Sequence, residues 1–379
     1  MPTFDYAPAP ESRAVVSLQP SYGLFIGGEF VEPASGEAMA SIEPATEALL
    51  AEVAVADDAD VDAAVRAARR AYQRTWSRLS GSERGKYLYR IARLLQERSR
   101  EFAVLESLDN GKPIKESRDV DVPLAAAHFF YYAGWADKLQ YAFPGKSPRP
   151  LGVAGQIIPW NFPLLMAAWK IAPALACGNP VVLKPAETTS LTAIRLAQIF
   201  QEAELPPGVV NIITGAGATG AALVNHPDIN KLAFTGSTEV GKRIAQVVAG
   251  TKKKLTLELG GKAANILFED APIDQAIEGV INGIYFNQGH VCCAGSRLFV
   301  QEGIYSKVIK KLRDRIQTLR VGNPLDKNTD IGAINSRPQL EKIRELVQSG
   351  VDEGAELTQT QCTLPVKGYW FAPSFLTGV

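Results

Sequence analysis

Two adjacent cysteines in a loop of small residues are the side chains of this sequence best suited to covalent chemistry. Cys292 and Cys293 lie in residues 286–296, which also contain Gly289 and Gly295 and follow an apolar helical pattern. A cysteine thiolate is a strong nucleophile, and small neighbours leave room for a substrate and for backbone N–H groups that stabilise an oxyanion. Adjacent cysteines seldom pair with each other, because the intervening peptide strains the ring. The alternative interpretation is that both are buried small hydrophobic residues.

Glu258 is a candidate general base. It alternates with leucines in residues 255–259, and this period predicts a largely buried strand that ends just before two glycines. A carboxylate in a partly apolar cleft can have a raised pKa, which suits a base that works near neutral pH. The alternative is that Glu258 is a structural partner at the end of the strand.

Asn161 is a lone amide in residues 157–163, where two prolines restrict the backbone and Trp160 and Phe162 are bulky neighbours. A side-chain amide that is held rigidly can stabilise a developing oxyanion. This segment therefore indicates a rigid loop with one hydrogen-bond donor, which is weak evidence by itself.

A turn between a strand and a helix in residues 234–241 indicates a pyrophosphate site. The segment reads Phe-Thr-Gly-Ser-Thr-Glu-Val-Gly, and Gly236 allows a ligand to approach the backbone closely. Free backbone N–H groups and the positive end of a helix bind phosphate oxygens. The spacing differs from the usual Gly-x-Gly-x-x-Gly fingerprint, so a glycine turn that serves packing alone is the alternative.

Lys184 and Glu187 follow another apolar strand, and Pro185 prevents this strand from continuing. Both side chains are placed to hydrogen-bond ribose hydroxyls. The negative charge of Glu187 would repel a 2′-phosphate, which favours NAD over NADP. A surface ion pair between the two side chains is the alternative.

Short apolar runs alternate with helical patterns from about residue 153 onward, which predicts βαβ units and a mainly parallel sheet with ligands at the carboxyl ends of its strands. Strands are expected at 153–158, 180–183, 209–213, 231–234 and 255–259, and helices at 191–202, 219–224 and 239–248. Two earlier helical patterns are expected to cover the sheet. One follows Asp57 and Asp58, which suit an N-terminal cap, and the other follows Ser82 and continues to Phe102.

A second set of elements begins near Ala263, with a strand at 264–268, a helix at 273–286 and a strand at 297–300. The boundary is therefore placed at the two glycines that follow Leu259. We expect residues 1–259 to form one domain and residues 260–379 to form a second one. Residues 138–150 contain three prolines and are expected to form a connecting arm.

The composition gives no reason to expect nucleic acid or a membrane as a partner. The 40 basic and 40 acidic residues balance, and the most apolar stretch, residues 152–176, is interrupted by prolines and by Lys170. The first 23 residues show no basic cluster followed by an apolar run. Four cysteines and three histidines show neither a disulfide framework nor a zinc pattern, so we expect no metal and a reducing cytoplasm.

Taken together, these segments resemble the aldehyde dehydrogenase superfamily from about Phe25 to the end of the chain. The resemblance implies an α/β fold, with a Rossmann-type parallel-sheet NAD-binding domain and a second, truncated α/β catalytic domain. All the motifs in this order are highly specific evidence. The motifs are residues 108–113 (Leu-Asp-Asn-Gly-Lys-Pro), 159–163, 184–187, 234–241, 257–262 and 289–296.

The resemblance also implies roles for single residues. Cys292 lies at the nucleophile position, Glu258 at the general-base position and Asn161 at the oxyanion position. The implied reaction is addition of the thiolate to an aldehyde, hydride transfer to the nicotinamide, and hydrolysis of the resulting thioester to an acid. The residues expected to lie against NAD are Ile158, Trp160, Lys184, Glu187, Gly217, Phe234, Gly236, Ser237, Gly241 and Leu259.

Three departures from the family pattern bear on this interpretation. His290 stands where the family usually has glutamine, the arm at 138–150 is short for the usual oligomerisation hairpin, and the chain stops at Val379. The family normally continues with a Glu-x-Phe-Gly-Pro motif and further strands, and without them the second sheet is expected to expose an edge and an apolar face. The lead at residues 6–11 and the short arm resemble the branch in which a second, degenerate unit follows.

Three other interpretations stay open at this point. The chain could be a non-catalytic scaffold subunit that keeps the fold, or it could be part of a larger multi-unit protein. We expect the complete protein to be a homodimer. An acylating enzyme that passes the thioester to coenzyme A is a closer alternative, against which Glu258 argues because it would serve water. The sequence does not specify which aldehyde is the substrate.

Overall fold

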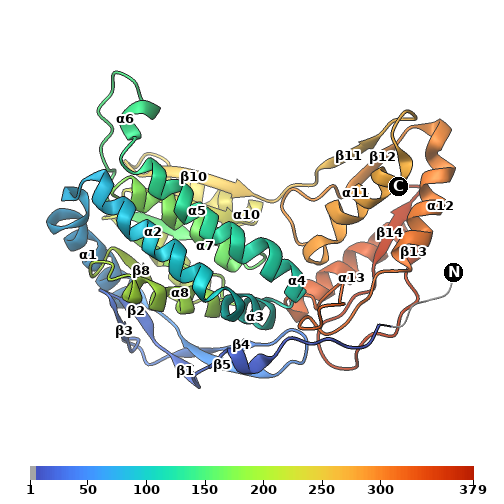
Figure 1. Cartoon of the computed structure of the whole chain (residues 1–379), viewed down its shortest axis with the longest axis horizontal. Coiled ribbons are helices and arrows are strands. Elements are labelled where there is room, and N and C mark those ends of the chain that lie inside the picture. Colours follow the sequence, from blue (N-terminus) through green and yellow to red (C-terminus); the bar gives the residue numbers. More distant parts are fainter. Residues whose placement is uncertain (1–5) are drawn as a thin grey trace.

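A seven-stranded sheet forms the centre of the larger part of the molecule (Figure 1). The computed structural model describes residues 6–379. The strands of this sheet are β2 (Leu24–Ile26), β3 (Glu29–Val31), β6 (Ala154–Ile157), β7 (Val181–Lys184), β8 (Val210–Ile212), β9 (Lys231–Gly236) and β10 (Lys254–Leu259). They are arranged in the order β10-β9-β6-β7-β8-β2-β3, and all neighbours from β10 to β8 are parallel. The predicted parallel sheet and its strands are therefore confirmed.

The order of the strands reverses beside β6. The chain runs from β6 through β7 to β8 and then returns to form β9 on the other side of β6. The loops that leave two such neighbouring strands turn to opposite faces of the sheet, and this opens a crevice at their carboxyl ends where ligands of α/β proteins bind. The crevice lies at the residues that follow Ile157 and at those around Gly236.

Helices cover both faces of the sheet because successive strand residues alternate between the faces. Val181 and Leu183 of β7 pack into one core, whereas Val182 packs into the other. The first core contains residues of α2 (Gly81–Glu97), α3 (Ser99–Asn110), α5 (Val122–Trp135), α7 (Pro163–Ala176) and α8 (Leu191–Glu202). The second contains residues of α1 (Asp58–Arg74), α9 (Gly217–Asn225) and α10 (Thr238–Val248).

The two early helices begin at capping boxes. Asp57 caps α1 as predicted, together with Asp60. The start predicted for α2 was wrong by two residues, because Ser80 accepts a hydrogen bond from the backbone N–H of Glu83 and Glu83 bonds back to Ser80. The helical pattern that continued to Phe102 is also divided at Arg98, where α2 ends and α3 begins.

Smaller elements complete this part of the chain. A three-stranded sheet has the order β1 (Ser21–Tyr22), β5 (Leu49–Ala54), β4 (Ala38–Ile42). Short helix α4 (Ile114–Glu116) and a π-helical turn at Ser117–Asp121 precede α5, and 3-10 turns lie at Arg13–Val15 and Trp76–Arg78. The arm at 138–150 projects from the body in Figure 1 and contains one helical turn, α6 (Leu139–Ala142).

The remainder of the chain has its own strands and its own core. A βαβ unit consists of β11 (Ala264–Leu267), α11 (Ile273–Tyr285) and the parallel strand β12 (Arg297–Val300). Helices α12 (Tyr305–Ile316) and α13 (Arg337–Asp352) follow, with the antiparallel pair β13 (Glu356–Gln359) and β14 (Ser374–Thr377), and 3-10 turns lie at Phe286–Gly289 and Glu302–Ile304. Ile277, Val308 and Leu312 belong to a separate core cluster. The division at residues 259 and 260 falls between β10 and β11, which are in different sheets, and it stays a prediction.

One face of the β11–β12 pair is uncovered. Ile266, Phe268 and Phe299 each expose more than half of their surface. Among residues 6–379, no helix combines the length and the apolar character that crossing a membrane requires.

Two glycines with similar backbone angles test how closely α1 packs on the sheet. Gly208 (φ +81°) precedes β8, and a methyl group there would lie 2.7 Å from the carbonyl oxygen of Ala67, whereas at Gly250 (φ +78°) it would meet no atom within 4 Å. We expect Gly250→Ala to cost about 1 kcal/mol of backbone strain, and Gly208→Ala to cost about 1–3 kcal/mol more because of the collision. Urea unfolding of both variants measures the difference. Equal losses would contradict the packing described here.

Candidate active site

Five of the predicted cofactor residues lie around the junction of β9, α10 and β10. Ser237 caps α10 and its Oγ accepts a hydrogen bond from Val240 N (3.3 Å), so the positive end of the helix is at the carboxyl edge of the sheet. A methyl group at Gly241 would collide with the side chain of Leu259, and one at Gly236 with the ring of Phe234. The two glycines therefore allow the turn and the helix to pack against the strand ends.

Lys184 lies at the end of β7, next to the other side of the crevice. Its Nζ donates a hydrogen bond to the carbonyl oxygen of Pro185 (2.9 Å) and is 3.8 Å from Glu187 Oε2. Burial lowers the pKa of Lys184. Glu187 exposes 55% of its side chain. The backbone N–H of Ile158 bonds to the carbonyl oxygen of Lys184 (3.1 Å), which joins the ends of β6 and β7.

The exposed Gly217 is the first residue of α9, and the same helix passes close to Lys184. A methyl group at Gly220, one turn further on, would be 3.5 Å from the Cδ atom of Lys184. The second helix N-terminus of the crevice is therefore near the buried lysine. The two helix ends provide positive backbone N–H groups that can bind phosphates. The side chains of Lys184 and Glu187 can bind hydroxyl groups.

Asn161 connects the crevice to the cysteine loop. Its Nδ2 donates a hydrogen bond to the carbonyl oxygen of His290 (2.7 Å), and its own carbonyl oxygen accepts one from Asn287 Nδ2 (2.7 Å). The ring of Trp160 meets the His290 ring edge to face, with centroids 4.8 Å apart. Asn287 has a left-handed backbone conformation (φ +49°), which turns the chain sharply just before the loop.

Cys292 and Cys293 are both exposed, and all four cysteines of the chain are free thiols. A methyl group at Gly261 would lie 3.3 Å from the carbonyl oxygen of Cys292, so the loop backbone passes beside the glycines that follow Glu258. Partial burial of the thiol, and secondarily Cys293, raises the pKa of Cys292. Among the described residues, no hydrogen bond joins Cys292 to Asn161 or to Glu258.

The surroundings predicted for Glu258 were wrong. The strand β10 is present, but Glu258 is exposed on it rather than set in a partly apolar cleft. The physical reason is that β10 is the outermost strand of the sheet and is paired only with β9. The side chains of Leu255, Leu257 and Leu259 point to the partly buried face, so Glu258 points to the open one.

The sequence profile of the aldehyde dehydrogenase family matches residues 30–379. The chain belongs to the aldehyde dehydrogenase family. Retinal dehydrogenase 2 of Homo sapiens is 46% identical, over 94% of this chain and 71% of the human protein. "Aldehyde dehydrogenase family 2 member B4, mitochondrial" of Arabidopsis thaliana is also 46% identical, over 94% of this chain and 68% of the plant protein.

Solved structures give the same result. The NAD+ complex of an aldehyde dehydrogenase from Bacillus cereus has a TM-score of 0.90 and 42% identity, over 95% of this chain and 75% of that one. The predicted family, the α/β fold class, NAD as cofactor and the activity of an NAD-dependent aldehyde dehydrogenase are thereby confirmed. The cradle formed by Gly236, Gly241 and the Ser237-capped helix end fits such a cofactor.

Sequence reasoning missed Lys170 of this aldehyde dehydrogenase as a candidate site residue. Burial lowers the pKa of Lys170 to about 8, and the nearby charge of Glu258 partly opposes this shift. A signal was available in the sequence, since Lys170 is the lone charged residue in the apolar helix α7.

A buried group of acidic residues around Lys112 was also missed. Lys112 Nζ lies 2.5 Å from Asp121 Oδ2 and 2.9 Å from the carbonyl oxygen of Asn161. Glu116 Oε2 accepts the backbone N–H of Asn287 (2.9 Å). Burial raises the pKa of both Glu106 and Glu116 to about 8. The contact of Lys112 with Asn161 spans 49 positions and that of Glu116 with Asn287 spans 171, so neither leaves a local pattern in the sequence.

His290, the departure from the family pattern, is half-buried beside this group. Burial, and secondarily the charge of Lys112, lowers the pKa of His290 to about 4, so the ring is neutral at physiological pH. Its Nε2 atom is buried and has no hydrogen-bond partner within residues 6–379. The contact with Asn161 uses the backbone carbonyl of His290, which the family's usual glutamine also has.

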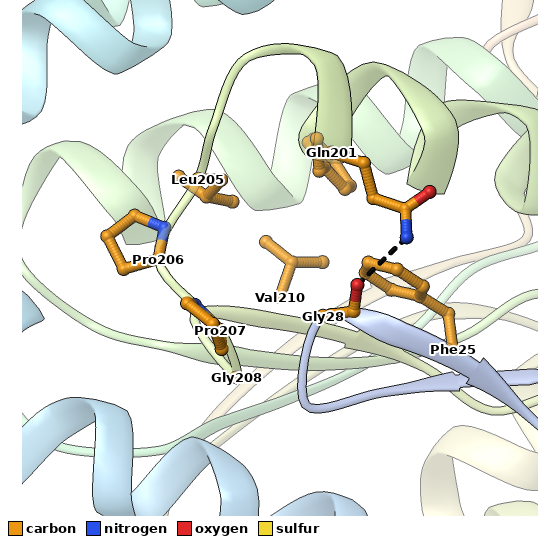
Figure 2. Close-up of a pocket in the computed structure, with 9 residues that line it drawn as sticks. Phe25, Gly28, Gln201, Leu205, Pro206, Pro207, Gly208 and Val210 are labelled. Carbon is orange, nitrogen blue, oxygen red and sulfur yellow. Dashed lines mark hydrogen bonds between the residues drawn. The ribbon is translucent and has the colours of Figure 1, made fainter.

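A cavity in the part of the chain that the structure describes lies away from these residues. Its volume is about 220 Å³. It lies between β2 and the loop that leads from α8 to β8, where Gln201 Nε2 donates to the carbonyl oxygen of Gly28 (2.9 Å) (Figure 2). It lies at the amino end of β8, whereas the candidate residues lie at the carboxyl ends of the strands, and none of them lines it. Residues 6–379 hold no group of His, Cys, Asp and Glu that could bind a metal ion.

Burial of Glu116 makes the stability of the enzyme depend on pH. Its pKa of about 8 in the folded state lies above the ordinary value of 4.5, so its stabilising contribution is complete below about pH 4.5 and is lost as pH rises toward 8. Glu116→Gln keeps an oxygen for Asn287 N but cannot ionise. We expect its free energy of unfolding to fall less between about pH 5 and 8 than that of the parent chain.

Urea unfolding at the two pH values measures this difference. Glu29→Gln, on an exposed side chain of β3, is the matched control and is expected to leave the pH dependence unchanged. An unaltered pH dependence in Glu116→Gln would show that Glu116 is ionised in the folded chain.

Proposed function

We propose that this aldehyde dehydrogenase oxidises its substrate through a covalent thioester on Cys292 and that water hydrolyses this thioester. The observation that carries the proposal is the 2.7 Å hydrogen bond from Asn161 Nδ2 to the carbonyl oxygen of His290. It holds a side-chain amide next to the loop of an exposed cysteine. Addition to an aldehyde requires a thiol that can reach the carbonyl carbon and a hydrogen-bond donor that can reach the carbonyl oxygen.

Cys292 is the attacking group. Its raised pKa means that the thiol form predominates near neutral pH, so addition includes transfer of the Sγ proton to solvent water, to which Cys292 is exposed. The carbonyl oxygen of the aldehyde then becomes an oxyanion. The second N–H of the Asn161 amide and the backbone N–H of Cys292 are the donors that stabilise it.

The crevice residues hold the dinucleotide. Lys184 and Glu187 bind the adenosine ribose, and the Ser237-capped end of α10 binds the pyrophosphate. Ile158, Trp160, Gly217, Phe234, Gly236, Gly241 and Leu259 form the walls of the site. NAD, when bound, supplies the hydride acceptor that turns the adduct on Cys292 into a thioester.

Glu258 activates the water that hydrolyses the thioester. Its exposed position at the end of β10 gives it access to solvent water, and the glycines that follow it lead directly past the Cys292 backbone. A water-activating carboxylate favours the hydrolytic reaction over transfer of the acyl group to coenzyme A.

We further propose a reducing cytoplasm and a homodimer. The four free thiols support the first proposal, although one plant relative is named as mitochondrial. The short arm at 138–150 supports a dimer over a larger assembly. Residues 1–259 and 260–379 are proposed as the NAD-binding and catalytic domains, because their strands belong to separate sheets.

Cys292→Ala tests the nucleophile. We expect the variant to lose aldehyde-dependent NADH formation by at least about 10³-fold, because no thioester forms, while NAD binding persists. Cys293→Ala is the matched control, and we expect it to keep most of the activity. NADH absorbance and calorimetric titration with NAD measure the two properties. Full turnover by Cys292→Ala would refute the assignment.

Glu187→Gln tests the preference between cofactors. Removal of the negative charge is expected to raise kcat/KM for NADP about tenfold, with a smaller effect on NAD, because the 2′-phosphate no longer meets a like charge. Glu204→Gln, an exposed glutamate away from the crevice, is the control. A parent enzyme that already prefers NADP would contradict the repulsion argument.

A further inference from the structure

Lys112 is a fully buried cation that is tied to the Asn161 loop. Its Nζ atom is held by Asp121 Oδ2 at 2.5 Å, and Glu106 Oε1 is 3.7 Å away. The side chains of Lys112, Asp121 and Glu106 all have 0% exposure. A buried lysine is stable only where its charge is paired and its N–H groups are bonded.

The residues around Lys112 contact successive parts of the loop that carries Asn161. Lys112 Nζ donates to the carbonyl oxygen of Asn161 (2.9 Å) and lies 4.3 Å from the centre of the Phe162 ring. Glu106 Oε2 accepts the backbone N–H of Leu164 (3.4 Å). On the other side, Asn110 Nδ2 donates to the carbonyl oxygen of Trp160 (2.6 Å). The loop is therefore held residue by residue from α3 and the segment after it.

These contacts restrict the direction of the Asn161 side chain. The carbonyl oxygen of Asn161 is bonded from two sides, by Lys112 and by Asn287 Nδ2 (2.7 Å), which fixes its peptide plane. One hydrogen of the side-chain amide is used by the carbonyl oxygen of His290 (2.7 Å). With the backbone and one N–H fixed, the other N–H has a single direction.

We propose that Lys112, anchored by Asp121, is a positioning residue that holds the Asn161 amide in its oxyanion-binding direction. The inference rests on the proposed role of Asn161. A purely structural lysine would stabilise the fold without affecting catalysis, and removing one partner of a buried ion pair destabilises the fold in either case. The distinction is therefore in the rate of the step that Asn161 serves.

The test compares Lys112→Met, Asn161→Ala and the double variant in the full chain. The rate of the first NADH formed after mixing with NAD and an aldehyde such as propanal reports the step in which the oxyanion is stabilised. We expect Lys112→Met to lower this rate about 10- to 100-fold, since a small misplacement of a catalytic donor has effects of that size. NAD affinity, measured by calorimetry, is expected to stay within about twofold of the parent.

The double variant identifies the route. If Lys112 acts through Asn161, Lys112→Met causes no further loss in the Asn161→Ala background. Asp109→Asn is the matched control, because Asp109 is equally buried on α3 but bonds to Ser41 Oγ (2.7 Å) and Leu191 N (2.9 Å) rather than to the loop. We expect this control to keep the parent rate.

Two results would overturn the inference: an unchanged rate in folded Lys112→Met, or losses that simply multiply in the double variant. If Lys112→Met does not fold, Asp121→Asn removes the anchor of Lys112 with little change of shape. The same rate is then measured for Asp121→Asn alone and combined with Asn161→Ala. A parent-like rate in Asn161→Ala would instead refute the proposed role of Asn161, so the two failures are distinguishable.

Discussion

The hydrogen bond between the Asn161 amide and the carbonyl oxygen of His290 is the interaction on which the proposed active site depends. The two residues are 129 positions apart: Asn161 is in the loop after β6 of the large sheet, and His290 is in the loop before β12 of the β11–β12 pair. Together with the bond from Asn287 Nδ2 to the Asn161 carbonyl oxygen, this contact joins the cysteine loop to the crevice of the large sheet. With it, the nucleophile loop and the residues that accompany the cofactor form one site.

The parallel sheet supplies the other half of this arrangement. Because the strand order reverses beside β6, the loop after β6 and the turn after β9 leave the same edge of the sheet toward opposite faces. The first loop carries Asn161, and the second carries Ser237 at the start of α10. The topology therefore explains how residues with different tasks, a donor for the oxyanion and a helix end for phosphates, lie at one crevice.

Local patterns were sufficient to predict most of the large sheet. Alternating apolar residues placed β10 within one residue of its observed start, and the helix at 191–202 has the predicted bounds. The sequence pattern gave the wrong start for α2, because the capping position depends on a contact between two side chains. Ser80, rather than Ser82, caps α2, because only Ser80 has a glutamate three residues later that bonds back to it.

The candidate site was predictable to the extent that its residues belong to quoted motifs. Asn161, Cys292 and Glu258 were identified from the sequence, but the exposure of Glu258 was not, because an alternating pattern shows which face a side chain takes and not what covers that face. Lys112 and Lys170 were missed as functional candidates for a related reason. Their environments come from burial against residues distant in the sequence, such as Asn161 for Lys112.

In the proposed reaction the acyl group passes through the sulfur of Cys292. Mass spectrometry of the Glu258→Gln variant, quenched in acid shortly after mixing with NAD and propanal, tests this directly. We expect a propionyl group on the peptide that contains residues 292 and 293, with fragment ions that place it on Cys292. Rapid NADH formation without any acylated cysteine, or with the acyl group on Cys293, would contradict it.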